Sequence, residues 1–288
     1  MIGAYVVEAA TSRGMRVIGL DRTAPRPEIH ELLEEFVLAD LETDSPIRLP
    51  DVSIHGTLHL AGISDLEQAT QDPGLAWKVN VDGTAKILRL AEEHGVQRFL
   101  LASSLYAGTN AGSEYGFSKL GAEALLRTWG PSLKMSWGIA RIGSVYGRHA
   151  PDNNTIQRIA SAVVTGVPLR LSVSQDAIRS YIHAADLASI LVKSVFEKEG
   201  EALFVVEGSS GWRIRDVVKL AEELSEKEIQ WSAESSRRYK TTPLSVNHPP
   251  RTLRPAEYEI SLPHGLQDLL ESLQLNSMPS DGVAGSKK

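Results

Sequence analysis

A serine, a tyrosine and a lysine in one short stretch are the residues of this sequence best suited to proton transfer. The run Leu101–Ser104 ends a predicted strand, and Tyr115 and Lys119 follow at a spacing that places them on one face of a helix. An ammonium near a phenol favours the phenolate and lowers the tyrosine pKa from its usual value of ~10. Tyr115 could then act as acid and base near neutral pH, with Ser104 hydrogen-bonded to the reacting oxygen. A Tyr-x-x-x-Lys pair alone is more often a helix surface pair, but the preceding Ser-Ser strand end favours the catalytic interpretation.

Asp21 and Arg22 directly follow a predicted strand at 16–20. A carboxylate at this position can accept hydrogen bonds from both hydroxyls of an adenosine ribose, which favours NAD over NADP. Arg22 could offset that preference, so NADP stays an alternative cofactor. The competing interpretation of Asp21 is a loop aspartate that caps the next helix.

Two further places could contact a ligand. Ala61 and Gly62 follow a predicted strand and are small enough for the backbone to approach a flat or phosphate-bearing molecule. Arg179 could hold a phosphate by a bidentate contact, or could instead pair with Asp176 or Asp186. Asp186 is also expected to cap the helix that follows it.

The elements that must position these residues alternate along the first two-thirds of the chain. Short apolar runs and helical patterns predict βαβ units, and hence an α/β fold with a doubly wound, Rossmann-like parallel sheet. Ligands of such folds bind at the carboxyl ends of the strands, where the candidate residues fall. The predicted strands lie at 16–20, 36–39, 57–61, 98–102 and 135–140, and the predicted helices at 4–12, 77–94 and 115–129.

The pattern is less regular after residue 150, where we predict helices at 154–164, 184–196, 214–224 and 264–273 and a strand at 202–206. We expect residues 1–150 to form an NAD(P)-binding domain that a segment at about 180–206 rejoins. Residues 151–276 would form mostly a small substrate-binding lobe. Residues 232–262 are polar and hard to assign, and 277–288 are predicted to be a disordered tail.

Composition excludes several classes of protein and site. The absence of cysteine excludes disulfides, Cys-ligated zinc and a thiol nucleophile. The net charge of −6 gives no overall attraction to nucleic acid or to an anionic membrane. Because no apolar run could span a bilayer and the amino terminus lacks a signal-peptide pattern, we expect a cytoplasmic protein. His55, His59 and His183 lack paired ligand spacing, so no metal is expected, and His59 is interpreted as a packed strand residue.

Taken together, the motifs resemble the extended short-chain dehydrogenase/reductase family, within the NAD-dependent epimerase/dehydratase group that acts on nucleotide sugars. The resemblance runs from Ile2 to about Leu273. It is carried, in family order, by VIGLD, HLAG, NVDGT, LASS, YGFSK, RIGSVYG and RSYIHAADLA. It implies NAD(P) bound over the sheet, Tyr115 as the acid/base, Lys119 gripping the nicotinamide ribose, and Ser104 hydrogen-bonded to the substrate.

The resemblance also implies binding roles that the patterns alone do not assign. Asp21 would hold the adenosine ribose, Asp40 and Leu41 would flank the adenine, and Arg179 would contact the diphosphate of a sugar nucleotide. The implied cofactor-binding residues are Gly3, Asp21, Arg22, Asp40, Leu41, Leu60, Ala61, Gly62, Asn80, Tyr115 and Lys119, and the implied substrate-binding residues are Ser104, Ser144 and Arg179.

The sequence departs from the family pattern in three places. The family opens with a strand and a Gly-rich turn that receives the pyrophosphate, and Gly3 matches only the last glycine of that turn. We therefore expect the first strand, which is central in the usual sheet, and most of the Gly-rich turn to be missing. Only 10 residues separate Ser104 from Tyr115, where the family commonly has a longer loop. Ser144 stands where sugar-nucleotide epimerases often carry an asparagine.

The same resemblance narrows the reaction. Sugar dehydratases of this family carry an Asp-Glu pair beside the catalytic Ser/Thr, whereas Leu105 and Tyr106 follow Ser104 here. Family epimerase–reductases for GDP-sugars use a cysteine, which this chain lacks. An epimerase or an oxidoreductase remains, and we favour an NAD-dependent epimerase of a nucleotide sugar.

Two alternatives stay open. One is a dehydrogenase or reductase of a free sugar or another small carbonyl compound. The other is a non-catalytic relative that senses nucleotides or serves as a scaffold. The family often forms homodimers through the helix of the Tyr-x-x-x-Lys motif, and Leu125 and Leu126 fit either such an interface or the core.

Overall fold

The computed structural model describes residues 1–108, 113–196, 203–234, 252–253 and 260–277. Its larger sheet is parallel, with the strand order β12-β9-β5-β4-β3. The strands are β3 (Gly56–His59), β4 (Arg98–Ser104), β5 (Ser136–Ile142), β9 (Leu203–Val206) and β12 (Thr252–Leu253). All seven residues of β4 are buried, because this strand has a neighbour on each side and helices on both faces.

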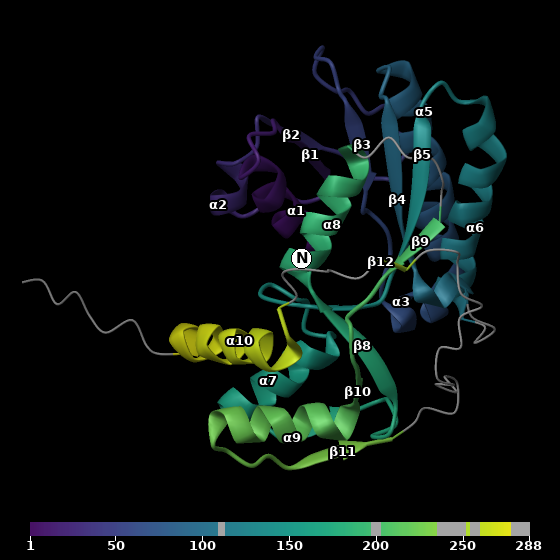
Figure 1. Ribbon diagram of the computed structural model, residues 1–288. Helices are drawn as coiled ribbons and strands as arrows, with labels where there is room; N and C mark the ends of the chain where they lie inside the picture. Colours follow the sequence, from purple (N-terminus) through teal and green to yellow (C-terminus); the bar gives the residue numbers. More distant parts are fainter. Residues whose placement is uncertain (109–112, 197–202, 235–251, 254–259, 278–288) are drawn as a thin grey trace, which may run out of the picture.

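Helices cover both faces of this sheet (Figure 1). On one face, α5 (Gly83–Glu93) and α6 (Glu114–Trp129) share an apolar core with β4 and β5. On the other face, α1 (Ile2–Thr11) packs along α8 (Ala184–Phe196). The predicted doubly wound α/β fold is therefore confirmed, and it turns the carboxyl end of β4 and the start of α6 toward the same edge of the sheet.

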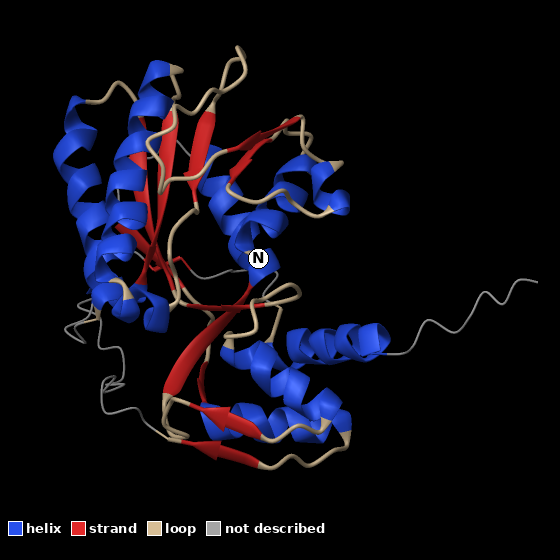
Figure 2. Cartoon of the chain, turned by 180° about the vertical axis from the view of Figure 1, so that it is seen from behind, coloured by secondary structure: helices blue, strands red, loops and turns tan. Residues whose placement is uncertain are grey.

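A separate two-stranded parallel sheet is formed by β1 (Ile18–Asp21) and β2 (Glu35–Leu38), joined through the short α2 (Pro27–His30). It lies beside β3 in the views of Figures 1 and 2, but among the described residues no strand pairs with both β1 and β3. Residues of β1 are accordingly only half-buried or exposed, unlike those of β4. The interruption falls where the sequence predicts that the usual central strand is missing.

The remaining elements form a lobe below the sheet (Figure 2). β8 (Ile178–His183) pairs in parallel with β6 (Ser144–Tyr146) and antiparallel with β10 (Gly211–Arg213), and β7 (Leu169–Leu171) pairs with β11 (Trp231–Ala233). Three helices pack against one another over a shared apolar core: α7 (Thr155–Thr165), α9 (Ile214–Ser225) and α10 (Leu262–Ser277).

The predicted helices and the strand at 202–206 are found close to their expected bounds. The short strands of the lobe were not predicted. Ser277 ends α10, and the rest of the predicted tail, 278–288, lies outside the described residues, as does most of 232–262. No helix in the described parts of the chain is both long and apolar enough to cross a membrane.

Candidate active site at the end of β4

Ser104 and Tyr115 come together where β4 ends and α6 begins. Ser104 is the last residue of β4, and Tyr115 is the second residue of α6, whose first turn is capped by Ser113 Oγ accepting from the N–H of Gly116 at 3.0 Å. A Cβ on Gly116 would lie 2.8 Å from the carbonyl oxygen of Tyr106, so glycine lets α6 start close against the turn Leu105–Gly108. Both side chains are buried, and Ser104 acts on the Tyr115 phenol as a hydrogen-bonding neighbour. The structure thus brings this pair together at the carboxyl end of β4.

The pKa of Tyr115 differs from the sequence expectation. Burial raises the pKa of Tyr115 above its usual value, and the hydrogen bond with Ser104 counteracts only part of that rise. The lowered pKa that the sequence predicts for Tyr115 is wrong for this structure, because removal of the phenol from water is the largest effect. Tyr115 is therefore protonated at neutral pH here, which is the form that can donate a proton.

Lys119 lies on the same buried face of α6, one turn after Tyr115. Its Nζ donates a hydrogen bond to the carbonyl oxygen of Ala102 on β4 at 3.1 Å. Burial lowers the pKa of Lys119 to about 8, and the nearby carboxylate of Glu123 opposes that shift. The ammonium also approaches the loop after β3, since a Cβ on Gly62 would lie 3.1 Å from Nζ.

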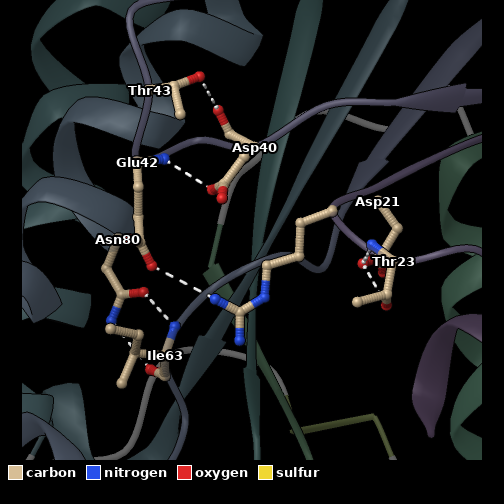
Figure 3. Close-up of polar contacts among 8 residues, drawn as sticks. Asp21, Thr23, Asp40, Glu42, Thr43, Ile63 and Asn80 are labelled. Carbon is tan, nitrogen blue, oxygen red and sulfur yellow. Dashed lines mark hydrogen bonds and ion pairs between the residues drawn. The ribbon is translucent and has the colours of Figure 1, made fainter.

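Asn80 fixes that loop. It sits in a π-helical turn, Lys78–Asp82, between α4 (Pro73–Trp77) and α5. Its Oδ1 accepts from the N–H of Ile63 at 2.8 Å, and its Nδ2 donates to the carbonyl of Ile63 at 3.0 Å (Figure 3). The same Nδ2 also donates to Ser118 Oγ at 2.8 Å. Since Ser118 in turn donates to the carbonyl of Tyr115, the amide joins the loop to the helix of the Tyr-x-x-x-Lys motif.

The loop itself is open on one side. Ala61 and Gly62 are exposed and Leu60 is half-buried. A Cβ on Gly62 would lie 2.6 Å from Asn80 Oδ1, so only glycine fits this position without displacing the amide. The exposed backbone of this loop lies beside Lys119, at the place where the sequence predicts the close approach of a ligand.

Asp21 and Asp40 end β1 and follow β2, and Figure 3 shows both carboxylates folded back onto their own loops. Asp21 Oδ1 accepts from the N–H of Thr23 at 3.1 Å, and Asp40 Oδ1 accepts from the N–H of Glu42 at 2.9 Å. Asp21 therefore caps its own turn rather than α2, whose N-cap residue is Arg26. It stays exposed at the carboxyl end of β1.

Arg22 and Leu41 are placed differently from these carboxylates. Arg22 Nη1 pairs with Glu42 Oε1 at 3.3 Å, and its side chain is 60% exposed. Leu41 is buried in the core against Gly83, so its side chain is turned away from the surface where it was expected to flank an adenine. Gly3 is exposed in the first turn of α1, where nothing lies within 4 Å of an added Cβ.

Two of the predicted substrate-binding residues, Ser144 and Arg179, lie on strands of the lobe. Ser144 begins β6 and is paired in register with Tyr181 of β8, two residues beyond Arg179. Arg179 Nη1 donates to the carbonyl of its neighbour Ile178 at 3.0 Å. The alternative partners expected for Arg179 are engaged elsewhere: Asp176 pairs with Arg215 at 2.7 Å, and Asp186 accepts from the N–H of Ile260 at 2.8 Å.

The start of α8 also differs from the sequence expectation for Asp186. The N–H of Ala185 is bonded by His183 Nδ1 at 3.2 Å, so a histidine serves the first turn of this helix.

Sequence reasoning missed two tyrosines, one that packs against Tyr115 and one that interacts with this neighbour. The ring of Tyr106 packs edge-on against that of Tyr115, with centroids 6.0 Å apart. Tyr106 also acts electrostatically on Tyr181, whose buried hydroxyl has no hydrogen-bond partner within the described residues. Burial raises the pKa of Tyr181. The one signal in the sequence for the contact between Tyr106 and Tyr115 is the position of Tyr106, two residues after Ser104.

His59 is packed as expected. It is buried in β3, and its Nε2 lies 3.1 Å from Thr84 Oγ1. Because the Thr84 hydroxyl donates to the carbonyl of Asn80, the imidazole must be the donor in that contact. The described parts of the chain contain no group of three or more His, Asp or Glu side chains arranged to hold a metal ion.

Comparison with known sequences identifies the family. A model of the NAD-dependent epimerase/dehydratase family matches residues 1–205. A UDP-glucuronate 4-epimerase from Thermodesulfobacterium geofontis is 24% identical over 185 residues, which cover 60% of this chain and 57% of that protein. A GDP-6-deoxy-D-mannose reductase from Pseudomonas aeruginosa is 26% identical over 227 residues, covering 72% of each chain. The first of these matches therefore spans less than two-thirds of its relative's length.

Solved structures share the fold over nearly the whole chain. The UDP-glucose 4-epimerase of Thermus thermophilus, solved with NAD, has a TM-score of 0.76 at 20% identity, and 96% of both chains is covered. MoeE5, solved with UDP-glucuronic acid and NAD, has a TM-score of 0.79 at 20% identity and the same coverage. Since the family model covers most of this sequence and the fold agrees, the chain belongs to the NAD-dependent epimerase/dehydratase family.

Proposed function

We propose that this protein is an NAD-dependent enzyme that oxidises and re-reduces a carbinol carbon of a nucleotide sugar, most simply as an epimerase. The observation that carries the proposal is the burial of Ser104 and Tyr115 together where β4 ends and α6 begins, with Lys119 one helical turn away on the same buried face. Relatives named as UDP-glucuronate and UDP-glucose 4-epimerases support the substrate class.

The residues on the cofactor side fit a dinucleotide in most places. Asp21 presents an exposed carboxylate at the end of β1 for the adenosine ribose. Gly62, which Asn80 and Lys119 approach so closely that a Cβ would clash with them, would present its exposed backbone to the nicotinamide ribose. When bound, NAD would accept a hydride from the sugar carbon and return it. Leu41 does not serve the adenine by its side chain, because it is buried.

Tyr115 and Ser104 would handle the proton. In the oxidising direction Tyr115 would first release its own proton to water, and the resulting phenolate would accept the proton of the sugar hydroxyl. The same proton would return from Tyr115 to the substrate oxygen when the ketone is reduced. Ser104 would donate a hydrogen bond to the same substrate oxygen and hold it within reach of the phenol. Lys119 would grip the cofactor ribose and supply the positive charge that favours transient phenolate at Tyr115. On the substrate side, Arg179 and Ser144 would face the nucleotide diphosphate and the sugar.

Calorimetric titration with NAD and NADP, followed by turnover of UDP-glucose and UDP-glucuronate, tests this proposal. We expect NAD to bind in the micromolar range and Tyr115→Phe to lower turnover by about 10²–10⁴-fold while binding NAD like the wild type. Tyr146→Phe is the matched control, since it removes a buried hydroxyl from the lobe core. Retained turnover in Tyr115→Phe would contradict the catalytic role.

A non-catalytic nucleotide-binding relative is the second candidate, and the interrupted sheet between β1 and β3 favours it. The same measurements separate the two. Binding without turnover on any nucleotide sugar would support the sensor. A reductase would differ from an epimerase by oxidising one NADH for each carbonyl group that it reduces, whereas an epimerase would leave the amount of cofactor unchanged.

A further inference from the structure

A buried ionic network lies directly behind the candidate site. Glu123, on α6, has no solvent exposure and accepts two hydrogen bonds from Arg141 of β5, from Nε at 2.8 Å and from Nη2 at 2.7 Å. Ser103 of β4 donates its hydroxyl to the same carboxylate at 2.6 Å. One carboxylate therefore ties α6 to both central strands of the sheet.

Stability alone does not account for this network. Two charges removed from water carry a large desolvation cost, and apolar residues of similar volume often hold such a position equally well. The three groups are also placed beside the candidate catalytic residues. Ser103 precedes Ser104, and Glu123 follows Lys119 by one helical turn on the same face.

Among the groups that interact with Lys119, Glu123 supplies the negative charge. From β3, His59 is buried and neutral because burial lowers its pKa to about 3. From α6, Tyr115 is protonated. From β5, Arg141 is a cation that shares the Glu123 carboxylate. From β4, the contact to Lys119 is the carbonyl of Ala102.

We propose that Glu123 is a positioning residue for Lys119, which fixes the turn of α6 that carries the lysine and keeps a carboxylate one turn from its ammonium. Arg141 and Ser103 hold that carboxylate in place. The consequence for catalysis rests on the proposed role of Lys119, but the placement and charge of Lys119 can be measured without any substrate. Burial lowers the pKa of Lys119 and Glu123 raises it, in agreement with this arrangement.

Three variants test the proposal by a charge signature: Glu123→Gln, Arg141→Met and the double variant. The lysines are labelled by reductive ¹³C-methylation, and the Lys119 signal is identified by its absence in Lys119→Arg. In the NMR titration we expect Glu123→Gln to lower the pKa of Lys119 by about 1 from the wild-type value, because a cation is left unpaired nearby. Arg141→Met should raise that pKa or leave it unchanged, and the double variant should lie between the two.

Both single variants disrupt the packing of the network. If Glu123 had a purely structural role, the two variants would shift the pKa of Lys119 in the same direction, or not at all. Either result would overturn the proposal. If Glu123→Gln does not fold, the double variant compared with Arg141→Met isolates the carboxylate, and an equal lysine pKa in these two would also overturn it. Glu93→Gln, on the exposed face of α5, is the control and should leave Lys119 unchanged. If wild-type protein binds no dinucleotide, the proposed function fails while the order of the lysine pKa values still decides this inference.

Discussion

Asn80 binds both backbone polar groups of Ile63, accepting from its N–H at 2.8 Å and donating to its carbonyl at 3.0 Å. The amide is 1% exposed, and Ile63 is buried as well. The loop that contains Ala61 and Gly62 thus takes its shape from a side chain in the π-helical turn after α4. π-helical turns are frequent at functional sites, and this one aims an amide at the place predicted to hold a ribose.

Replacing Asn80 by alanine should therefore be costly for both folding and binding. Two buried backbone groups would lose their partners, at about 1–3 kcal/mol each. We expect denaturant unfolding to show a loss of about 2–4 kcal/mol, and titration to show weaker NAD binding. Gln97→Ala removes an exposed amide and should change neither. Unchanged unfolding in Asn80→Ala would contradict the role given to this side chain.

Lys119 should lower the stability of the fold below about pH 8. Its pKa is lowered from 10.5 to about 8 by burial, so between these values the unfolded chain binds a proton that the folded chain does not. The free energy of unfolding therefore rises as the pH increases from about 8 to 10.5. Below pH 8 the buried ammonium of Lys119 lowers the free energy of unfolding by its full amount, on the order of 3 kcal/mol at most. A residue retained at such a cost is expected at a functional site.

The variant Lys119→Met should accordingly be more stable than wild type at pH 7, by about 1–3 kcal/mol in denaturant unfolding. The difference should shrink as the pH rises from 8 and should vanish above about pH 10.5. Lys134→Met, at an exposed position, serves as control. A Lys119→Met variant that is less stable at pH 7 would show that the hydrogen bond to Ala102 outweighs desolvation of the ammonium.

Much of the central unit could be predicted from the sequence because its signals are local. The apolar run of β4, the spacing of Tyr115 and Lys119, and the Ser-Ser strand end all lie within one strand–helix unit. In such a unit the carboxyl end of the strand and the first turn of the helix share an edge of the sheet. The meeting of Ser104 and Tyr115 follows from that geometry.

The Glu123–Arg141 network could not be predicted in this way. The two residues are 18 positions apart, and their contact depends on the rotation of α6 and on the register of β5 against β4. The predicted direction of the Tyr115 pKa shift was wrong for a related reason. Helical spacing shows which groups are near one another, but not how deeply they are buried. In the lobe, three-residue strands such as β6 and β10 carry too few residues to show a period.

Acid should destabilise the fold through His59. Burial lowers the pKa of His59 from 6.5 to about 3. Between these pH values the unfolded chain binds a proton at this residue and the folded chain does not. The free energy of unfolding should fall by about 1.4 kcal/mol per pH unit from this residue as the pH drops toward 3. His183, whose pKa burial lowers to about 4, acts in the same direction.

Denaturant unfolding at several pH values between 7 and 4 checks this. His59→Gln should make the pH dependence shallower by about one proton, and His30→Gln, at an exposed position, should leave it unchanged. An equally steep dependence in His59→Gln would mean that other groups cause the acid sensitivity.

The last prediction concerns self-association through an apolar patch formed by Trp77, Phe117 and Leu120, which are 49%, 61% and 42% exposed. The patch joins α4 to α6, since the ring of Trp77 packs against Gly121. Leu125 and Leu126, which the sequence offered for an interface, instead pack in the core. Because large apolar side chains gathered on one surface favour association, we predict a homodimer through this patch.

Sedimentation of Phe117→Asp/Leu120→Asp should then show a monomer with an unchanged melting temperature. The control Val167→Asp replaces an exposed valine outside the patch and should stay dimeric. Wild-type protein that sediments as a monomer at tens of micromolar would exclude the interface, because such a concentration corresponds to a dissociation free energy of only about 6 kcal/mol.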